Sequence, residues 1–252
     1  MTKILLHGAG GYMGRVVAEL AAEDDTVEIV AGIDLVDDGS HAFPIYTDIH
    51  ACDVAADVVV DFSVAKAVDG LLSFCEERSL PVVLCTTGLS EEQLKRTEAL
   101  AEKVAVLRSG NMSLGINTLL SMVKKAAEIF SPAGFDIEVL ERHHNRKLDA
   151  PSGTALMLAD AAKEGMGTDC EYVFDRSQRR EKRHPNEIGI SAVRGGNIVG
   201  VHEVIFAGTD EVITLTHQAS SRAVFGNGAL AAAKFLTGKP AGQYDMLDVI
   251  EG

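Results

Sequence analysis

The chain has few positive charges. Its 252 residues include 23 lysines and arginines against 37 aspartates and glutamates, which gives a formal net charge of −14. Binding to nucleic acid or to an anionic membrane surface requires clustered cations, so neither partner is expected for the chain as a whole. The basic segment at residues 175–184 lacks interleaved aromatic residues, which argues against nucleic-acid binding there as well.

Long apolar runs and closely spaced cysteines are also missing. The N-terminal segment MTKILLHGAGG has too short an apolar run for a signal peptide, and no stretch reaches the roughly 20 apolar residues of a membrane span. A cytoplasmic location without a membrane partner is therefore expected. The cysteines show no C-x-x-C spacing, and three of them lie in or beside apolar segments, which favours reduced thiols over a disulfide or a zinc site.

Short β-branched runs alternate with helical spacing in the first half of the chain, and 46% of all residues are hydrophobic, enough for a sizeable core. In chain order the candidate elements are KILLHG, GRVVAELAAE, VEIVAGID, DVVVDFS, a helix around 65–78, PVVLCTT, a helix at 90–102 and VAVLRSG. This alternation predicts an α/β fold, a Rossmann-type doubly wound parallel sheet with right-handed crossovers, over residues 1–112.

A second, smaller α+β domain is predicted over residues 113–221. A helix at roughly 114–129 leads into the strand FDIEVLE, and residues 165–187 form a polar loop. The segment 222–252 is Ala-rich and predicted to be helical, so we expect it to return to the first domain.

Residues 189–219 contain three apolar runs with strand spacing, and we expect antiparallel strands within a mixed sheet. Gly195 and Gly196 separate the first two runs. A glycine pair suits a tight hairpin turn, because such turns need positive φ angles.

A glycine turn follows the first strand directly, as KILLH runs into GAGGYMGRVVAEL. The strict G-x-G-x-x-G spacing is absent, and Gly8, Gly11 and Gly14 form a G-x-x-G-x-x-G variant. Glycines at such a strand-to-helix turn let the backbone approach a pyrophosphate at the helix N-terminus. Asp34, about 20 residues further on, ends the next strand, where a carboxylate accepts hydrogen bonds from a ribose. The alternative is a tight turn in an enzyme that binds no nucleotide.

The same carboxylate bears on the choice of cofactor. Asp34 would repel the 2′-phosphate of NADPH, and apolar residues follow it where an arginine would be needed. The acidic pair at 37–38 strengthens this preference, so NADH is predicted as the preferred cofactor. Arg15 or Lys66 could still reach the phosphate, which leaves NADPH as an alternative.

The sequence CTTG closes the fourth predicted strand of the first domain. Ligands bind at the carboxyl edge of open parallel sheets, so Thr86, Thr87 and Gly88 are candidates for the nicotinamide side of the site. A plain strand-ending turn is an equally good interpretation of these residues.

A helix start with nearby cations follows the strand FDIEVLE, within the stretch ERHHNRKLDAPSGTALMLAD. Ser152 is a favourable N-cap, and the N–H groups of Gly153 and Thr154 would then form an anion site at the helix N-terminus. Lys147, with Arg146 as a second candidate, would add positive charge. The site therefore suits a ligand with carboxylate groups.

Two adjacent histidines precede this helix. Neighbours on a strand point to opposite faces, so His143 and His144 are predicted to have different tasks, one as a general acid and one as a hydrogen-bond donor to substrate. A metal site with Glu141 is the first alternative, but the spacing matches no H-E-x-x-H pattern and no metal is predicted. A solvated strand end is the second.

The pattern E-x-H-H-x-x-K-x-D-A-P-S-G-T-A resembles the signature of the dihydrodipicolinate reductases of bacterial lysine and diaminopimelate synthesis. The likeness covers the whole chain, including the glycine turn, CTTG, SGNMSLGIN, GISAVRGGNIVGVHEVIF and THQASSRAVFGNGAL. The resemblance implies an NAD(P)H-dependent reduction of 4-hydroxy-tetrahydrodipicolinate, a cyclic dicarboxylate, to tetrahydrodipicolinate. It also implies a homotetramer assembled through the sheet of the second domain.

The resemblance also implies roles for the residues of the histidine motif. His143 would be the proton donor, and Lys147 would contact the substrate and support catalysis. The substrate carboxylate would be held by His144, Gly153 and Thr154.

In this family the glycine turn and the segment near residue 110 hold the nicotinamide dinucleotide. Tyr12 stands where some relatives carry an arginine thought to help bind the 2′-phosphate, which again favours NADH. The residues expected at the cofactor are Gly8, Gly11, Tyr12, Met13, Gly14, Asp34, Thr86, Thr87, Gly88, Gly110, Asn111, Met112 and Ser113.

Some interpretations stay open on the sequence alone. The basic segment 175–184 suits either a lid that steers a dianion or a solvated mobile loop, and hinges near 109–113 and 220–222 would allow closure. An amino-acid dehydrogenase would share the glycine turn, although the histidine motif argues against it. A redox sensor that binds both ligands without turnover is the third interpretation, since ligand binding does not prove catalysis.

Overall fold

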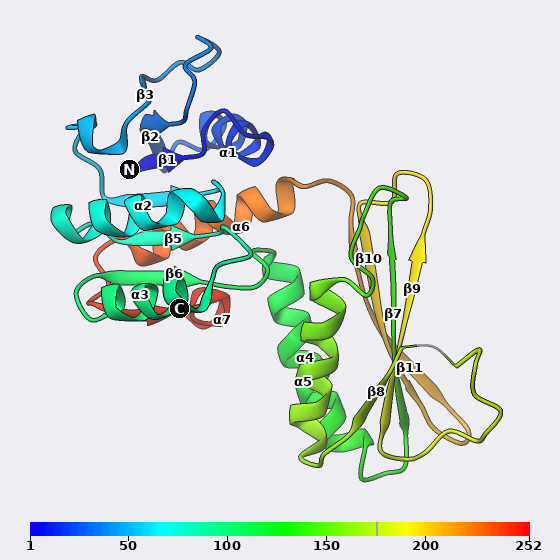
Figure 1. Ribbon diagram of the computed structural model, residues 1–252. Coiled ribbons are helices and arrows are strands. Elements are labelled where there is room, and N and C mark those ends of the chain that lie inside the picture. Colours follow the sequence, from blue (N-terminus) through cyan, green and yellow to red (C-terminus); the bar gives the residue numbers. More distant parts are fainter. Residues whose placement is uncertain (175) are drawn as a thin grey trace. The chain divides into compact units, whose positions relative to one another are not determined.

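The computed structural model describes residues 1–174 and 176–252 and divides into two compact units (Figure 1). Residues 1–114 and 222–252 form the first unit, and residues 115–221 form the second. The chain therefore passes from one unit to the other twice. Within the described ranges, no helix is both long enough and apolar enough to cross a membrane.

A seven-stranded sheet forms the centre of the first unit. Its strands are β1 (Thr2–His7), β2 (Val27–Ile33), β3 (Ile45–Tyr46), β4 (Val58–Asp61), β5 (Val82–Leu84), β6 (Ala105–Arg108) and β12 (Gly242–Tyr244). All neighbouring strands are parallel, in the order β12-β6-β5-β4-β1-β2-β3, which confirms the predicted doubly wound sheet. The strand order reverses between β1 and β4, where such sheets bind ligands.

Helices cover both faces of this sheet. One face packs against α1 (Tyr12–Ala22), α6 (Ala223–Leu236) and α7 (Met246–Glu251), and the other against the 3-10 turn η1 (Ile49–Ala51), α2 (Ala65–Arg78) and α3 (Glu91–Ala101). Consecutive residues of β1 enter opposite cores: Ile4 and Leu6 face α1 and α6, whereas Leu5 faces α2. Burial on both faces explains why the strands are continuous apolar runs.

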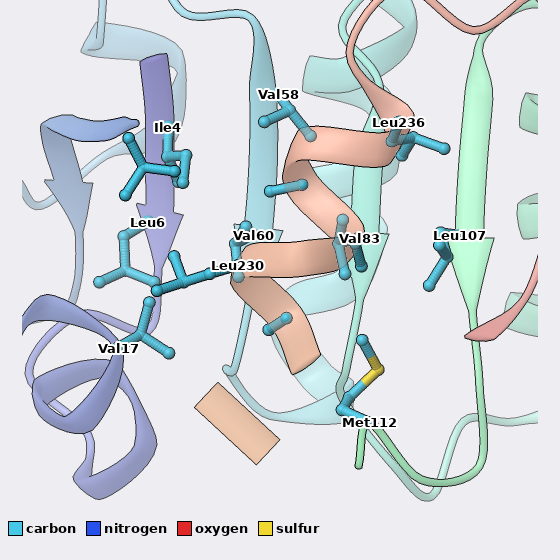
Figure 2. Packing of buried hydrophobic residues seen from close by; sticks show 14 of the residues in the cluster. Ile4, Leu6, Val17, Val58, Val60, Val83, Leu107, Met112, Leu230 and Leu236 are labelled. Atoms are coloured by element: carbon cyan, nitrogen blue, oxygen red, sulfur yellow. The ribbon is translucent and has the colours of Figure 1, made fainter. Parts of the chain in front are cut away.

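The Ala-rich C-terminal segment forms α6, which packs across β1, β4, β5 and β6. Its small residues allow a close approach to the strands. Leu230 lies beside Val60, and Leu236, at the other end of the helix, belongs to the same cluster (Figure 2). Segments far apart in sequence thus share one hydrophobic core.

The second unit is a five-stranded mixed sheet with two helices on one face. Its elements are α4 (Leu114–Phe130), β7 (Asp136–His143), α5 (Gly153–Met166), β8 (Glu171–Val173), β9 (Glu187–Arg194), β10 (Gly200–Ala207) and β11 (Val212–Ala219). The order is β11-β10-β7-β9-β8, with β10 antiparallel to both of its neighbours and β7, β9 and β8 parallel to one another. This confirms the predicted mixed sheet.

The predicted hairpin at Gly195 and Gly196 is wrong, because β9 and β10 pair with opposite edges of β7 and not with each other. The connection instead crosses the end of β7. There the Gly195 N–H donates to the His143 carbonyl at 2.9 Å, and the Asn145 N–H donates to the Gly196 carbonyl at 3.2 Å. The polar loop predicted over residues 165–187 also contains the short strand β8.

The basic segment is held by ion pairs. Asp175 lies outside the described residues, but Arg176 binds the buried Glu187 at 2.5 Å and Arg183 binds Asp136 at 2.6 Å. These carboxylates begin β9 and β7, at the opposite end of the sheet from His143. These two arginines are therefore neither freely solvated nor next to the histidines, as a solvated loop or a lid over that site would require.

Close backbone packing at the glycine turn predicts a measurable effect on stability. A Cβ on Gly14 would lie 2.2 Å from the Gly8 carbonyl oxygen. Gly14→Ala is therefore expected to lower the free energy of unfolding by about 1–3 kcal/mol. Gly70 of α2 has open space where a Cβ would stand. Gly70→Ala should therefore raise the free energy of unfolding by up to about 1 kcal/mol. Urea denaturation measures both, and equal stability of the two variants would contradict the packing.

Candidate functional site

The glycine turn brings the backbone of β1 against the start of α1. Gly8 has φ +80°, and a Cβ there would lie 2.6 Å from the Phe62 carbonyl oxygen, so only glycine fits. The N-cap of α1, Gly11, makes no side-chain hydrogen bond to the helix. The N–H groups of the first turn therefore form the kind of positive helix end that binds phosphate.

Asp34 lies beside this turn at the end of β2. Its carboxylate accepts hydrogen bonds from the Gly10 N–H at 2.8 Å and the Leu35 N–H at 2.7 Å. A pocket of about 520 Å³ is lined by Gly8, Gly11 and Asp34 of the predicted cofactor residues. The carboxylate has acceptor capacity left for hydroxyl groups in this pocket.

A second pocket, of about 400 Å³, brings together six further predicted cofactor residues. They are Met13, Thr86, Thr87, Gly110, Asn111 and Met112. Phe62 and Ser63 line both pockets, so the two lie next to each other at the end of β4. This is the edge where the strand order reverses.

Four predicted cofactor residues are not among those lining these two pockets. Gly14 contributes close packing, and the N–H of Ser113 donates to the Asn111 side chain at 2.8 Å. Gly88 lines a separate surface pocket. Tyr12 is 64% exposed, and the guanidinium of Arg222 lies 4.9 Å from the centroid of its ring.

A buried hydrogen-bonded pair lies at the ends of β1 and β4 and was not predicted from the sequence. His7 and Asp61 are register partners on β1 and β4, and the His7 Nδ1 lies 2.7 Å from an Asp61 carboxylate oxygen. Burial alone would raise the pKa of Asp61, but His7, followed by the side chains of Ser63 and Thr86, outweighs it and lowers the pKa. The pair holds the loop that carries Phe62 and Ser63. Asp61 directly follows the apolar run at residues 58–60, and this position was the sequence signal for a buried carboxylate.

Arg15, the cation considered for a 2′-phosphate, is already engaged. It donates to Asp38 at 2.5 Å, to Ser40 at 2.9 Å and to the Gly10 carbonyl at 3.1 Å. Hydrogen bonds from Ser40 and Arg15 hold the pKa of Asp38 below its usual range. Lys66 lines the same pocket as Asp34.

The second unit places Glu141 and His143 on one face of β7. The Glu141 side chain is fully buried, and the His143 Nδ1 lies 2.6 Å from one of its oxygens. Arg194 donates to both oxygens at 2.7 Å, and the Ser152 N–H donates at 3.0 Å. Burial would raise the pKa of Glu141, but the hydrogen bonds from Arg194, His143 and Ser152 lower it. Glu141 is therefore an ionised carboxylate without access to water.

A third histidine, His202, packs against His143 and was not predicted from the sequence. The His202 ring lies 5.1 Å from the His143 ring, and its Nε2 lies 3.1 Å from the Ser152 Oγ. Burial, followed by the charge of His143, lowers the pKa of His202 to about 4, so this side chain is neutral at pH 7. Its register partner on β7 is Glu141, a pairing that no local pattern reveals.

The predicted helix cap after this strand is confirmed. The Ser152 Oγ accepts a hydrogen bond from the Ala155 N–H at 3.2 Å. Gly153 is exposed, with open space where a Cβ would stand, so a ligand can approach the backbone of the first turn of α5. Because the Ser152 N–H also donates to Glu141, this helix end is connected to His143 through the Glu141 carboxylate.

The other predicted residues lie in the loop between β7 and α5. The Lys147 N–H donates to the His144 carbonyl at 3.2 Å, which forms a turn. The Lys147 ammonium pairs with Asp149 at 2.9 Å, and this hydrogen bond is the main reason for the lowered pKa of Asp149. Arg146 binds the Asn197 side chain at 2.9 Å.

A metal at Glu141 does not fit these contacts, because both of its oxygens already accept hydrogen bonds. In residues 1–174 and 176–252, no group of three or more His, Cys, Asp or Glu side chains could hold a metal ion. The four cysteines have free thiols.

A glycine turn at the switch point of a doubly wound sheet, with a carboxylate at the end of β2, defines a dinucleotide-binding α/β protein. The second unit adds a mixed sheet with a histidine cluster. Two family models match consecutive parts of the chain: "Dihydrodipicolinate reductase, N-terminus" matches residues 2–112, and "Dihydrodipicolinate reductase, C-terminus" matches residues 115–250. The chain belongs to the dihydrodipicolinate reductase family.

Relatives of similar length support this assignment. A 4-hydroxy-tetrahydrodipicolinate reductase of Caldanaerobacter subterraneus is 52% identical over 100% of this chain and 99% of its own length. One of Clostridium tetani is 46% identical, covering 98% of this chain and 96% of its own. A dipicolinate-bound dihydrodipicolinate reductase structure from Paenisporosarcina sp. TG-14 has a TM-score of 0.82 at 24% identity, with 99% of both chains covered, and shows the shared fold.

Proposed function

We propose that this chain reduces 4-hydroxy-tetrahydrodipicolinate to tetrahydrodipicolinate with His143 as the proton donor and NADH as the preferred cofactor. The reductase activity, a step of lysine biosynthesis, follows from family membership, and this family uses NADH or NADPH. A cytoplasmic location belongs to the same proposal.

The observation that carries the proposal is the hydrogen-bonded path from His143 through Glu141 and Ser152 to the N-terminus of α5. It ties a proton-donating imidazole to a helix end that attracts anions. A substrate carboxylate bound at the N–H groups of Gly153 and Thr154 would therefore stand in fixed relation to His143. Lys147 would add positive charge, and His144 would donate a further hydrogen bond.

The residues of the first unit fit a nicotinamide dinucleotide. Gly8 and Gly14 keep the turn free of side chains, and the first turn of α1 offers N–H groups to a pyrophosphate. The 4-hydroxyl group would leave as water to give the unsaturated ring, and the reduced nicotinamide, when bound, would supply a hydride to that ring. His143 would then give a proton to the negative charge that develops there.

Three observations favour NADH over NADPH. Asp34 places a carboxylate in the pocket next to the glycine turn, where it would repel a 2′-phosphate. Arg15 already pairs with Asp38, so binding the phosphate would require breaking that pair. Tyr12 is exposed and uncharged.

The role of His143 can be tested by its replacement with glutamine. His143→Gln is expected to lower kcat by about 100- to 10,000-fold, the usual range for loss of a general acid, while NADH binding changes little. The assay couples the chain to a dihydrodipicolinate synthase and follows the absorbance of NADH. Near-normal turnover in the variant would remove His143 from this role. Failure of the unaltered chain to oxidise either cofactor would point to a ligand-binding sensor.

The cofactor preference can be tested at Asp34. The unaltered chain is expected to have a higher kcat/KM with NADH than with NADPH, and Asp34→Ser should narrow this ratio because the repulsion is lost. Asp25→Ser, which removes an exposed carboxylate in the turn between α1 and β2, is the matched control and should leave the ratio unchanged. Equal use of both cofactors by the unaltered chain would contradict the preference.

The homotetramer is supported by the uncovered face of the second unit's sheet. Strand alternation places Val193 and Val212 on the face away from α4 and α5, where they are 43% and 62% exposed. Light scattering after size exclusion should give the mass of four chains, and Val193→Asp should favour smaller species. A single-chain mass for the unaltered protein would contradict the proposal.

A further inference from the structure

We propose that Glu141, clamped by Arg194, is the positioning residue of this site and fixes His143 with a proton on Nδ1, so that Nε2 is the nitrogen that donates to substrate. This inference rests on the proposed role of His143. Glu141 touches the imidazole and Arg194 touches Glu141. Neither residue contacts the substrate in the proposed mechanism.

The tautomer follows from the donors around Glu141. The carboxylate is ionised and can only accept hydrogen bonds. The His143 Nδ1 at 2.6 Å must therefore carry a hydrogen and donate it. A neutral His143 then has its lone pair on Nε2, and a protonated His143 releases its proton from Nε2 while keeping the bond to Glu141.

The surroundings of Nε2 agree with this assignment. Gly200 on β10 faces that nitrogen, and a Cβ there would lie 3.1 Å from it. Glycine at this position therefore leaves the Nε2 side of the ring unobstructed by the neighbouring strand. The carbonyl of His143 is held by the Gly195 N–H at 2.9 Å, which limits movement of its backbone.

Arg194 holds the carboxylate in one orientation. Its two terminal nitrogens each bind one oxygen of Glu141 at 2.7 Å, a bidentate geometry that fixes the carboxylate plane. One of them also donates to the Asp149 carbonyl at 2.6 Å, next to the ion pair between Asp149 and Lys147. Arg194 thus connects the loop that carries Lys147 to Glu141, the hydrogen-bond partner of His143.

Three titratable or charged groups lie next to His143. Glu141 lies on β7, Arg194 is the register partner of His143 on β9, and the neutral His202 lies on β10. Lys147, in the loop before α5, acts on the pKa of His202. Among these, Glu141 carries the negative charge and contacts the imidazole directly. Its removal would leave Arg194 as the nearest charge and would favour the neutral ring.

Glu141→Gln should therefore lower kcat on the order of 100-fold, with little change in KM for NADH, and move the alkaline limb of the kcat profile to lower pH. The matched control is Glu187→Gln, which alters a buried carboxylate that pairs with Arg176 at the far end of the same sheet. The control should keep its kcat and pH profile. Equal kcat and pH profiles in the two variants would overturn the proposal.

The double variant Glu141→Gln/His143→Gln separates positioning from general structural damage. If Glu141 acts through His143, the double variant should be no slower than His143→Gln alone. If the losses in kcat of the two single variants multiply in the double variant, the proposal is overturned. Near-normal turnover of His143→Gln alone would instead overturn the proposed function, so the two failures are distinguishable.

Glu141→Gln leaves a buried arginine without its partner and could fail to fold. Glu141→Met/Arg194→Met removes both charges together, which folded proteins commonly tolerate. This variant should fold, bind NADH and show a kcat lower on the order of 100-fold. A folded double methionine variant with normal kcat would overturn the proposal.

Discussion

A fully buried carboxylate, Glu141, imposes the geometry of the second unit's site. An ionised carboxylate without water must receive hydrogen bonds on both oxygens, or the cost of burying its charge would be several kcal/mol. Its donors come from β9, from the cap of α5 and from its own strand. Satisfying this single group therefore aligns the histidine, the helix end and the loop that carries Lys147.

The two units place their functional groups by the same rule. In the first unit, the pockets lie at the carboxyl ends of parallel strands, where the connections diverge and leave backbone groups free for ligands. In the second unit, His143 and Arg194 are register partners at the carboxyl ends of the parallel strands β7 and β9. A buried carboxylate with a side-chain partner supports each site, Asp61 with His7 in the first unit and Glu141 with Arg194 in the second.

Periodic features of the sequence predicted the fold well. Prediction failed for contacts between residues that are distant in the sequence. Continuous apolar runs between helical segments correctly predicted a parallel sheet covered on both faces, and Ser152 correctly predicted a helix start. Gly195 and Gly196 suggested a hairpin because turn chemistry is local, whereas β7 occupies the position between the two strands. The basic segment suited either a lid or a solvated loop because its carboxylate partners, such as Asp136, are remote in sequence.

The sequence by itself determined the class of fold, the glycine turn, the helix cap and the family motif, because each depends on spacings of a few residues. The tertiary structure alone decided that Glu141 is buried, that Arg194 and His202 join His143, and that Arg15 is engaged by Asp38. These contacts arise when distant segments lose water together, and the groups that can pair are then selected by the high cost of an unpaired charge.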